Sequence, residues 1–263
     1  MTDLPRIRAA AASLAAAACF VAASLVAGAA AASPNAPVAA VQPVLVELFT
    51  SQGCSACPPA DALLNELADR EDVLALSYNI TYWDYLGWRD TLGREEHTAR
   101  QEAYANRFEH RKYTPQVVID GRSHMPGSRT DAVMDAIGER LRRDDVPAGD
   151  DANTVAAIAN GSGYHLEAAA RGEGSATIWL VHFDRRHEVE ITRGENAGET
   201  FVYANVVRDI EPIATWDMSR PLDADIPADV IRAGGHDGCA VIVQTGLMGP
   251  VIAVARLDMA ALN

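Results

Sequence analysis

Cys54 and Cys57, separated by Ser55 and Ala56, are the residues of this chain with the clearest capacity for chemistry. A thiolate is the nucleophile in thiol–disulfide exchange, and it needs a lowered pKa and access to solvent. Cys54 is expected in the first turn of a helix, where free backbone N–H groups and the helix dipole favour negative charge. The spacing therefore predicts a redox pair in which Cys54 attacks a substrate disulfide and Cys57 resolves the mixed disulfide.

Three other uses of the pair remain open on this reasoning. A structural zinc ion is usually bound by four Cys or His ligands, and the sequence has no second CxxC and no nearby HxxxH. A Cu(I) ion accepts two thiolates, and His124 and Met125 in GRSHMPG could assist them. A permanent structural disulfide is the third alternative, although so short a loop constrains the unfolded chain little.

The residues around the cysteines predict a strand before them and a helix after them. The apolar run at 44–49 has the length of a buried strand. Pro58 and Pro59 fit the first turn of a helix, where a missing N–H costs little. Farther along, the patterns predict strands at 72–80, 114–120 and 123–125, helices at 94–111 and 131–143, and a hairpin turn at Asp120-Gly121. A βαβ half followed by a ββα half predicts an α/β domain.

The pattern changes in the second half of the chain. Residues 144–153 are polar and acidic and contain Pro and Gly, which is typical of a linker. Beyond them, short β-rich runs separated by Gly, Asn and Asp follow one another without a clear helix. These runs predict a mostly antiparallel, β-sandwich-like domain. We therefore expect a CxxC domain at 33–146 and a β-rich domain at 147–263.

The first 32 residues have the features of a secretory signal. Arg6 and Arg8 precede an apolar run that ends in small residues around Ala32, so cleavage is expected before Ser33. An uncleaved membrane anchor is the alternative, since the run approaches the roughly 20 residues that span a bilayer; its high alanine content favours cleavage. We expect a periplasmic or secreted protein with no integral membrane segment after cleavage, in a compartment where thiols can be oxidised.

The charge of the chain limits its partners. Its 263 residues carry a formal net charge of −14, and an acidic chain repels phosphate backbones, so nucleic acid is not an expected partner. The expected partners are protein or small-molecule thiols and disulfides, without a bound cofactor. A Cu(I) carrier that uses the same two thiolates, or a non-catalytic interaction module, are the alternative functions.

A second motif strengthens the redox interpretation. Thr114-Pro115 immediately precedes QVVIDG, and the order CxxC, helix, Thr-Pro, strand, hairpin and helix resembles the thioredoxin superfamily. The resemblance implies that Pro115 follows a cis peptide bond and packs against the disulfide, and that Thr114 faces the substrate. Three segments are also similar to an exported bacterial thioredoxin-like family, domain-of-unknown-function family 1223: LFTSQGCSACPPADALL, YWDYLGW and YTPQVVIDG.

That family resemblance implies a thioredoxin-like fold and export, and it brings no settled activity. The chain departs from well-studied thioredoxins in three places. Ser-Ala stands between the cysteines, Pro-Pro follows them, and a long aromatic insertion precedes Thr114.

Other residues have weaker signals. Glu47 lies in the strand before the cysteines, where a buried carboxylate could relay the proton of Cys57 or could simply face solvent. Asp61 is interpreted as a surface or helix-start charge, and Cys239 as an inert buried thiol. His182 and His187 form no recognisable ligand set. Four aromatic residues could line a peptide groove or pack the insertion onto the core: Tyr82, Trp83, Tyr85 and Trp88.

Overall fold

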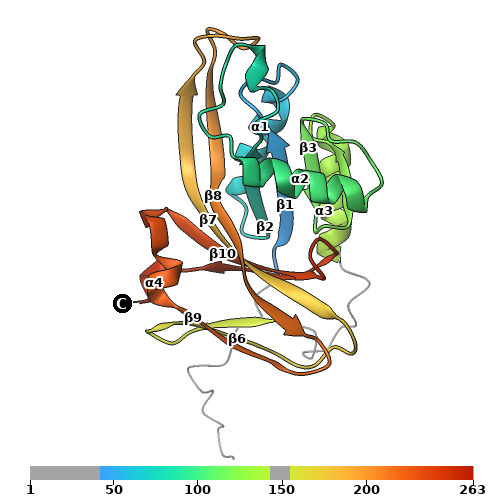
Figure 1. Cartoon of the computed structure of the whole chain (residues 1–263), viewed down its shortest axis with the longest axis vertical. Helices are drawn as coiled ribbons and strands as arrows, with labels where there is room; N and C mark the ends of the chain where they lie inside the picture. Colours follow the sequence, from blue (N-terminus) through green and yellow to red (C-terminus); the bar gives the residue numbers. More distant parts are fainter. Residues whose placement is uncertain (1–41, 143–154, 263) are drawn as a thin grey trace, which may run out of the picture. The chain divides into compact units, whose positions relative to one another are not determined.

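Strands from both halves of the sequence join one large sheet in the computed structural model, which describes residues 42–142 and 155–262. This eight-stranded sheet has the order β11-β10-β7-β8-β2-β1-β3-β4, and a second, three-stranded sheet has the order β5-β6-β9 (Figure 1). Most neighbouring strands are antiparallel, so the protein is a mixed α/β fold with a large, mostly antiparallel sheet and few helices.

The strands are β1 (Val44–Thr50), β2 (Val73–Asn79), β3 (Gln116–Ile119), β4 (Ser123–Pro126), β5 (Ala156–Ala159), β6 (Gly163–Ala168), β7 (Ser175–Glu190), β8 (Thr200–Asp217), β9 (Leu222–Pro227), β10 (Gly238–Thr245) and β11 (Val251–Leu257). The helices are α1 (Pro58–Ala68), α2 (Glu95–Arg107), α3 (Thr130–Arg142) and the short α4 (Ala228–Ile231). The predicted signal peptide at 1–32 and the predicted linker at 144–153 lie outside the described residues.

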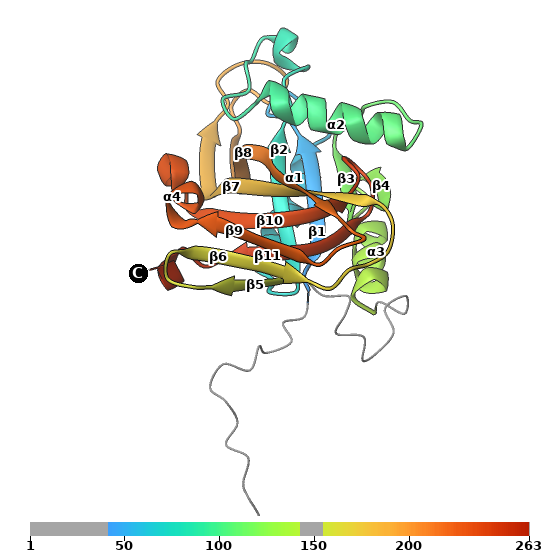
Figure 2. The ribbon, with the colours of Figure 1, turned by 60° about the horizontal axis from the view of Figure 1, so that its bottom comes forward.

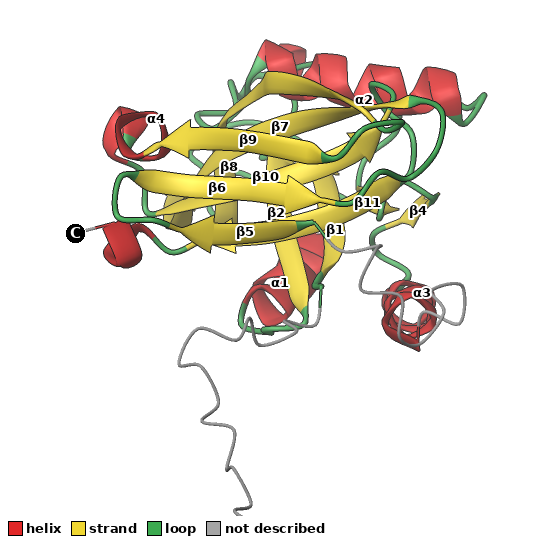
Figure 3. Ribbon diagram, turned by 90° about the horizontal axis from the view of Figure 1, so that it is seen from below, coloured by secondary structure: helices red, strands yellow, loops and turns green. Residues whose placement is uncertain are grey.

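The first half has the predicted element order. β1 and β2 are parallel, and β3 runs antiparallel to β1 and pairs with β4. At the β3–β4 turn, Asp120 and Gly121 both have positive φ, as a two-residue hairpin turn requires. Helices α1 and α3 cover one face of these strands and α2 covers the other (Figure 3).

Side chains alternate along β1 between those two faces. Leu45 and Phe49 pack with Tyr104 of α2. Val46 and Leu48 pack instead with α1 and α3. Each face is therefore apolar and closed by helix, which explains why every residue of β1 is buried.

The second half is β-rich, as predicted, but its strands are longer than the sequence indicated. Two of the expected short runs, at 176–183 and from residue 187 on, are merged in the single strand β7, which pairs with β8 in one long hairpin. Strand β9 and helix α4 were not predicted. The three-stranded sheet lies across β7 and β10, and the side chains between the two layers form a separate apolar cluster (Figure 2).

The expected boundary at residue 147 does not separate two cores. Leu76 and Tyr78 of β2 pack in one cluster with Val181 of β7 and Ile242 of β10, and the described residues of both halves belong to one compact unit. β8 also bridges to β2 in parallel at Val206. The physical reason is that an unpaired edge of β2 would leave backbone donors and acceptors exposed, and β8 covers that edge.

Candidate redox site

The loop between β1 and α1 carries the two cysteines, which are joined in a disulfide. Cys57 is fully buried and Cys54 is 4% exposed, while Ser55 and Ala56 between them are exposed. Pro58 and Pro59 occupy the first two positions of α1 as predicted, and Cys57 is the N-cap. Cys54 therefore lies before the helix and not in its first turn, which corrects that expectation.

The same two prolines weaken the expected contribution of the helix end to the Cys54 thiolate. Pro58 and Pro59 have no backbone N–H, and the amide of Ala60 donates to the carbonyl of Cys57. The first turn of α1 therefore offers few free backbone donors to a sulfur at Cys54.

Thr114 hydrogen-bonds the sulfur of Cys54 directly. Its hydroxyl donates to Sγ of Cys54 at 3.3 Å, and it accepts a hydrogen bond from the indole Nε1 of Trp83 at 2.7 Å. Because hydrogen bonds in a chain polarise one another, the indole makes the hydroxyl a better donor to sulfur. The Thr114–Pro115 peptide bond is cis, as predicted, and Pro115 is buried.

The aromatic insertion holds the loop that leads to Cys54. The indole of Trp88 donates to the side-chain oxygen of Gln52 at 2.7 Å. The backbone N–H of Gln52 donates to a carboxylate oxygen of Asp90 at 2.8 Å. Gly53 packs against Trp83, where an added Cβ would meet the Trp83 Cβ at 3.3 Å. Most of the insertion therefore packs onto the site, and Tyr85, 75% exposed, is its outward-facing aromatic residue.

Asn196, at the tip of the β7–β8 hairpin, reaches the same loop from the β-rich half. Its amide nitrogen donates to the carbonyls of Gln52 at 2.8 Å and Cys54 at 3.2 Å. In Figure 1 the hairpin extends past β10 and runs beside α1. The sequence analysis missed this residue, because nothing in the polar stretch around it distinguishes it from an ordinary turn.

Glu47 is buried, but it lies on the α2 side of β1, away from α1. Its carboxylate accepts from Nε of Arg100 at 2.7 Å and from the hydroxyl of Tyr104 at 2.5 Å. Burial by itself lowers the pKa of Arg100, but the Glu47 carboxylate and the Tyr104 and Tyr78 hydroxyls together outweigh it and raise that pKa, so the guanidinium is charged. Glu47 thus has an ion pair on the opposite face of the strand from α1, which removes the reason for assigning it the proton of Cys57.

Asp61 is a buried carboxyl group that lies on the same side of β1 as Cys57. It lies on α1 one turn after Cys57, with its amide bonded to the Cys57 carbonyl, and it is only 5% exposed. Its Oδ1 has no hydrogen-bond partner among the described residues. Burial raises the pKa of Asp61 to about 7, the nearby Thr50 hydroxyl lowers it, and the Asp90 carboxylate raises it further.

Asp61 lies in the first turn of α1, as the helix-start interpretation expected, but the surface interpretation was wrong because the side chain is buried. A signal for its burial was present in the sequence: residues 57, 61 and 64 recur at helical spacing on one face of α1. The other two are Cys57 and Leu64, and both are buried. The position of Asp61 on that face, and not its charged type, agrees with its burial.

The residues proposed as copper helpers have other contacts. His124 hydrogen-bonds the hydroxyl of Tyr113 at 2.9 Å, and its ring packs at a tilt against Phe108. Met125 packs against the cluster between β1 and the helices. Within residues 42–142 and 155–262, no group of three or more His, Cys, Asp or Glu side chains could hold a metal ion.

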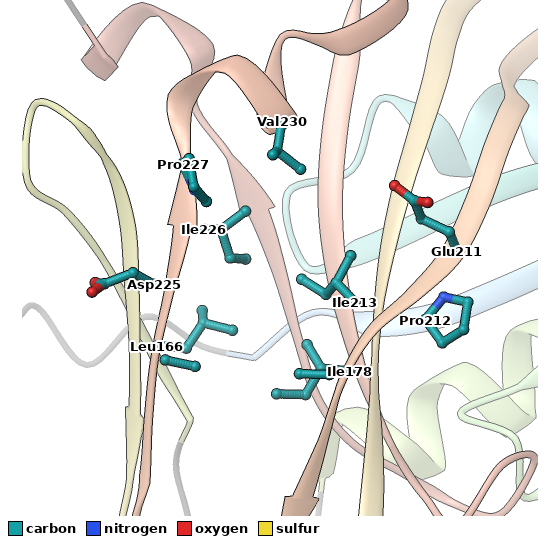
Figure 4. Close-up of a pocket in the computed structure, with 11 residues that line it drawn as sticks. Leu166, Ile178, Glu211, Pro212, Ile213, Asp225, Ile226, Pro227 and Val230 are labelled. Atoms are coloured by element: carbon teal, nitrogen blue, oxygen red, sulfur yellow. The ribbon is translucent and has the colours of Figure 1, made fainter.

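Two further features lie away from the disulfide. Cys239 is buried as expected, and burial raises the pKa of its thiol to about 12. A cavity of about 300 Å³ opens between β8 and β9. Figure 4 shows its aliphatic lining, including Leu166, Ile178 and Ile226, with the carboxylates of Glu211 and Asp225 beside it. Its lining contains no thiol or hydroxyl side chain.

None of the described helices is long and apolar enough to cross a membrane.

Comparison with known proteins places the chain in a family. The chain is similar to a crystal structure of a protein from Agrobacterium tumefaciens, with 32% identity and a TM-score of 0.67 over 82% of this chain and 94% of that chain. It is also similar to HBP35 of Porphyromonas gingivalis, with 12% identity and a TM-score of 0.44 over 83% and 76% of the two chains. No curated protein matches it. The family model described as "Protein of unknown function (DUF1223)" matches residues 45–244, and the chain therefore belongs to the DUF1223 family.

Proposed function

We propose that this protein carries out thiol–disulfide exchange through Cys54 and Cys57. The observation that supports this most is the donor chain from Trp83 through Thr114 to Sγ of Cys54. A hydroxyl directed at a sulfur stabilises a thiolate more than a disulfide, because hydrogen bonds to charged acceptors are the stronger ones. Such a donor lowers the pKa of a thiol, and a lowered pKa is the property that exchange requires.

The steps of the exchange follow from the two positions. The Cys54 thiolate attacks a substrate disulfide, forms a mixed disulfide and releases one substrate thiolate. Cys57 then loses its proton and attacks Sγ of Cys54, which forms the Cys54–Cys57 disulfide and releases the second substrate thiolate. Two electrons pass from the protein dithiol to the substrate disulfide, and the reverse sequence oxidises a substrate dithiol. Cys54 is the entry point because it is the less buried of the two.

Asp61 is the group we assign to the proton of Cys57. A buried thiol deprotonates poorly, and a carboxyl group whose pKa lies near 7 exchanges protons readily at neutral pH. Asp61 and Cys57 are four residues apart on one helix face, a spacing at which side chains are neighbours. The proton passes between them directly or through one water molecule.

A thioredoxin-like arrangement of the first half is part of the proposal. The strand order β2-β1-β3-β4, with β1 and β2 parallel and the other pairs antiparallel, supports it. The cis Thr114–Pro115 bond and the contact of Thr114 with Cys54 support it further. The substrates of this proposal are protein or small-molecule disulfides and thiols.

Export to the periplasm or outside the cell is also a proposal, and it rests on the composition of residues 1–32. Its measurement is the N-terminal sequence of the protein produced in a bacterium. Ser33 as the first residue would support cleavage of a signal peptide, and a protein that retains Met1 and fractionates with membranes would contradict it.

The exchange itself is tested by equilibrating the protein with reduced and oxidised glutathione. We expect wild-type protein and Cys239→Ser to reach the same equilibrium between dithiol and disulfide. Cys57→Ser should accumulate a mixed disulfide with glutathione at Cys54, whereas Cys54→Ser should not form one at Cys57 at a comparable rate. A wild-type disulfide that does not exchange would identify a structural bridge and contradict the proposal.

Copper binding is a separate outcome of the same preparation. Titration of the reduced protein with Cu(I), followed by thiolate-to-metal charge-transfer absorbance, measures it directly. Tight stoichiometric binding together with absent exchange would favour the carrier over the exchange function. The positions of His124 and Met125 give no support to that carrier.

A further inference from the structure

The loop that carries Cys54 is held between two segments far apart in the sequence. On one side, Trp88 and Asp90 of the aromatic insertion bind Gln52. On the other side, Asn196 of the β7–β8 hairpin binds the carbonyls of Gln52 and Cys54. The β-rich half thus supplies a hydrogen-bond donor to the backbone of the reactive cysteine itself.

The tip of the hairpin is held in a fixed place, so that Asn196 is preorganised. The amide of Ile191 bonds the carbonyl of Glu199 across the base of the tip. Gly194, with φ +80°, approaches so closely that an added Cβ would meet the Trp88 Cβ at 3.1 Å. Asn196 is 9% exposed, which keeps its two hydrogen bonds away from bulk water and strengthens them.

We propose that Asn196 is a positioning residue that sets the thiolate stability, and hence the redox poise, of Cys54. This inference rests on the proposed exchange function. The carbonyl oxygens of Gln52 and Cys54 carry partial negative charge, and they belong to the loop that holds Sγ of Cys54, which becomes negative on reduction. Asn196 compensates that charge with its N–H groups and fixes the carbonyl of Cys54, so the thiolate forms in a less negative field. The second half of the chain therefore regulates the site built mainly by the first half.

The test compares Asn196→Ala and Asn196→Asp with a matched control on the same hairpin. Asn65 of α1 donates to the carbonyl of Val202 in β8 at 2.9 Å, so Asn65→Ala loosens the contact between the hairpin and α1 but leaves the cysteine loop untouched. Asn196→Asp keeps the shape of the side chain and replaces the donor with an acidic acceptor. The measurements on each reduced protein are the pKa of Cys54 and the equilibrium constant with glutathione, with circular dichroism as the control for folding.

We expect Asn196→Ala to raise the pKa of Cys54 and to shift the equilibrium toward the disulfide by about threefold or more, which is about 14 mV for this two-electron couple. Asn196→Asp should shift both in the same direction and further, and Asn65→Ala should shift neither. The inference is wrong if Asn196→Asp leaves both quantities unchanged or moves them the other way, or if Asn65→Ala shifts them equally. A wild-type protein that does not equilibrate with glutathione would overturn the proposed function instead.

Discussion

Glu47 and Asp61 are two buried carboxylates near the same strand, and their surroundings differ completely. Glu47 lies on the α2 face of β1, where Arg100 and Tyr104 satisfy both of its oxygens. Asp61 lies on the α1 side, where its Oδ1 has no partner in the described part of the chain and burial raises its pKa to about 7.

The difference separates a structural carboxylate from a chemical one. A buried ion-paired acid fastens the elements that meet at it. Here those elements include β10, because Gln244 donates to the Tyr104 hydroxyl at 3.0 Å. An unpaired buried acid can take up or release a proton near neutral pH. The Glu47 side thus helps to join the two halves of the chain, whereas the proton transfer that we propose belongs to the Asp61 side.

The largest effect is expected from breaking the ion pair. Arg100→Met leaves the Glu47 carboxylate buried without its cation, and removing one partner of a buried pair costs about 3–5 kcal/mol. Urea denaturation measures this free energy of unfolding. The double variant Glu47→Met, Arg100→Met removes both charges and should lose much less. A single variant within about 1 kcal/mol of wild type would show that Glu47 does not depend on Arg100.

The next effect is the pH dependence of stability that Asp61 causes. Its pKa is about 7 in the folded protein against an ordinary 3.8, so between these values the folded protein holds a proton that the unfolded chain has lost. The free energy of unfolding therefore falls as pH rises through this window, by up to about 1.4 kcal/mol per pH unit. Asp61→Asn removes this loss and should be more stable than wild type at pH above 7, with the difference vanishing toward low pH.

Urea titrations of the disulfide form at several pH values test this, and parallel curves for the two proteins would contradict it. A kinetic readout separates stability from chemistry. With Asp61→Asn, release of glutathione from the Cys54 mixed disulfide should slow markedly near pH 7, while formation of that mixed disulfide stays unchanged.

A smaller effect is expected at the hydroxyl that contacts Cys54. Thr114→Val keeps the shape and removes the donor, and a hydrogen bond to a charged group contributes about 1.5–3 kcal/mol. The pKa of Cys54 should rise by about 1 or more, measured from the ultraviolet absorbance of the thiolate against pH. Trp83→Phe keeps the hydroxyl and should raise it less. If the two variants raised the pKa of Cys54 equally, packing around the sulfur would set that pKa, and the donor chain would not.

The smallest effect on stability is expected at Tyr85, which is 75% exposed. Tyr85→Ala should change the free energy of unfolding by no more than about 0.5 kcal/mol. If the exposed ring contacts polypeptide substrates, kcat/KM for a peptide disulfide should fall while the rate with oxidised glutathione stays constant. If Tyr85→Ala matches wild type with both substrates, the aromatic insertion has a packing role alone.

Local pattern was sufficient for most of the first half. Strand length, the prolines after Cys57 and the turn chemistry of Asp120-Gly121 are local properties, and the strands, helices and hairpin that they predict are present. Local pattern failed for the long hairpin, because Asp184, Arg185 and Arg186 interrupt the apolar alternation of β7 without ending the strand. Hydrogen-bonded pairing with β8 keeps the backbone extended in that charged stretch.

The sequence by itself determined the pair of cysteines, the strand before them, the helix after them and the Thr-Pro segment, since each depends on neighbours in the chain. Only the tertiary structure decided which charged groups are paired and which segments hold the site. Arg100 neutralises Glu47 across 53 positions, and Asn196 reaches Cys54 across 142. The energy of a buried charge or carbonyl depends on what lies within a few ångströms of it, and chain order does not specify those neighbours until the sheet is assembled.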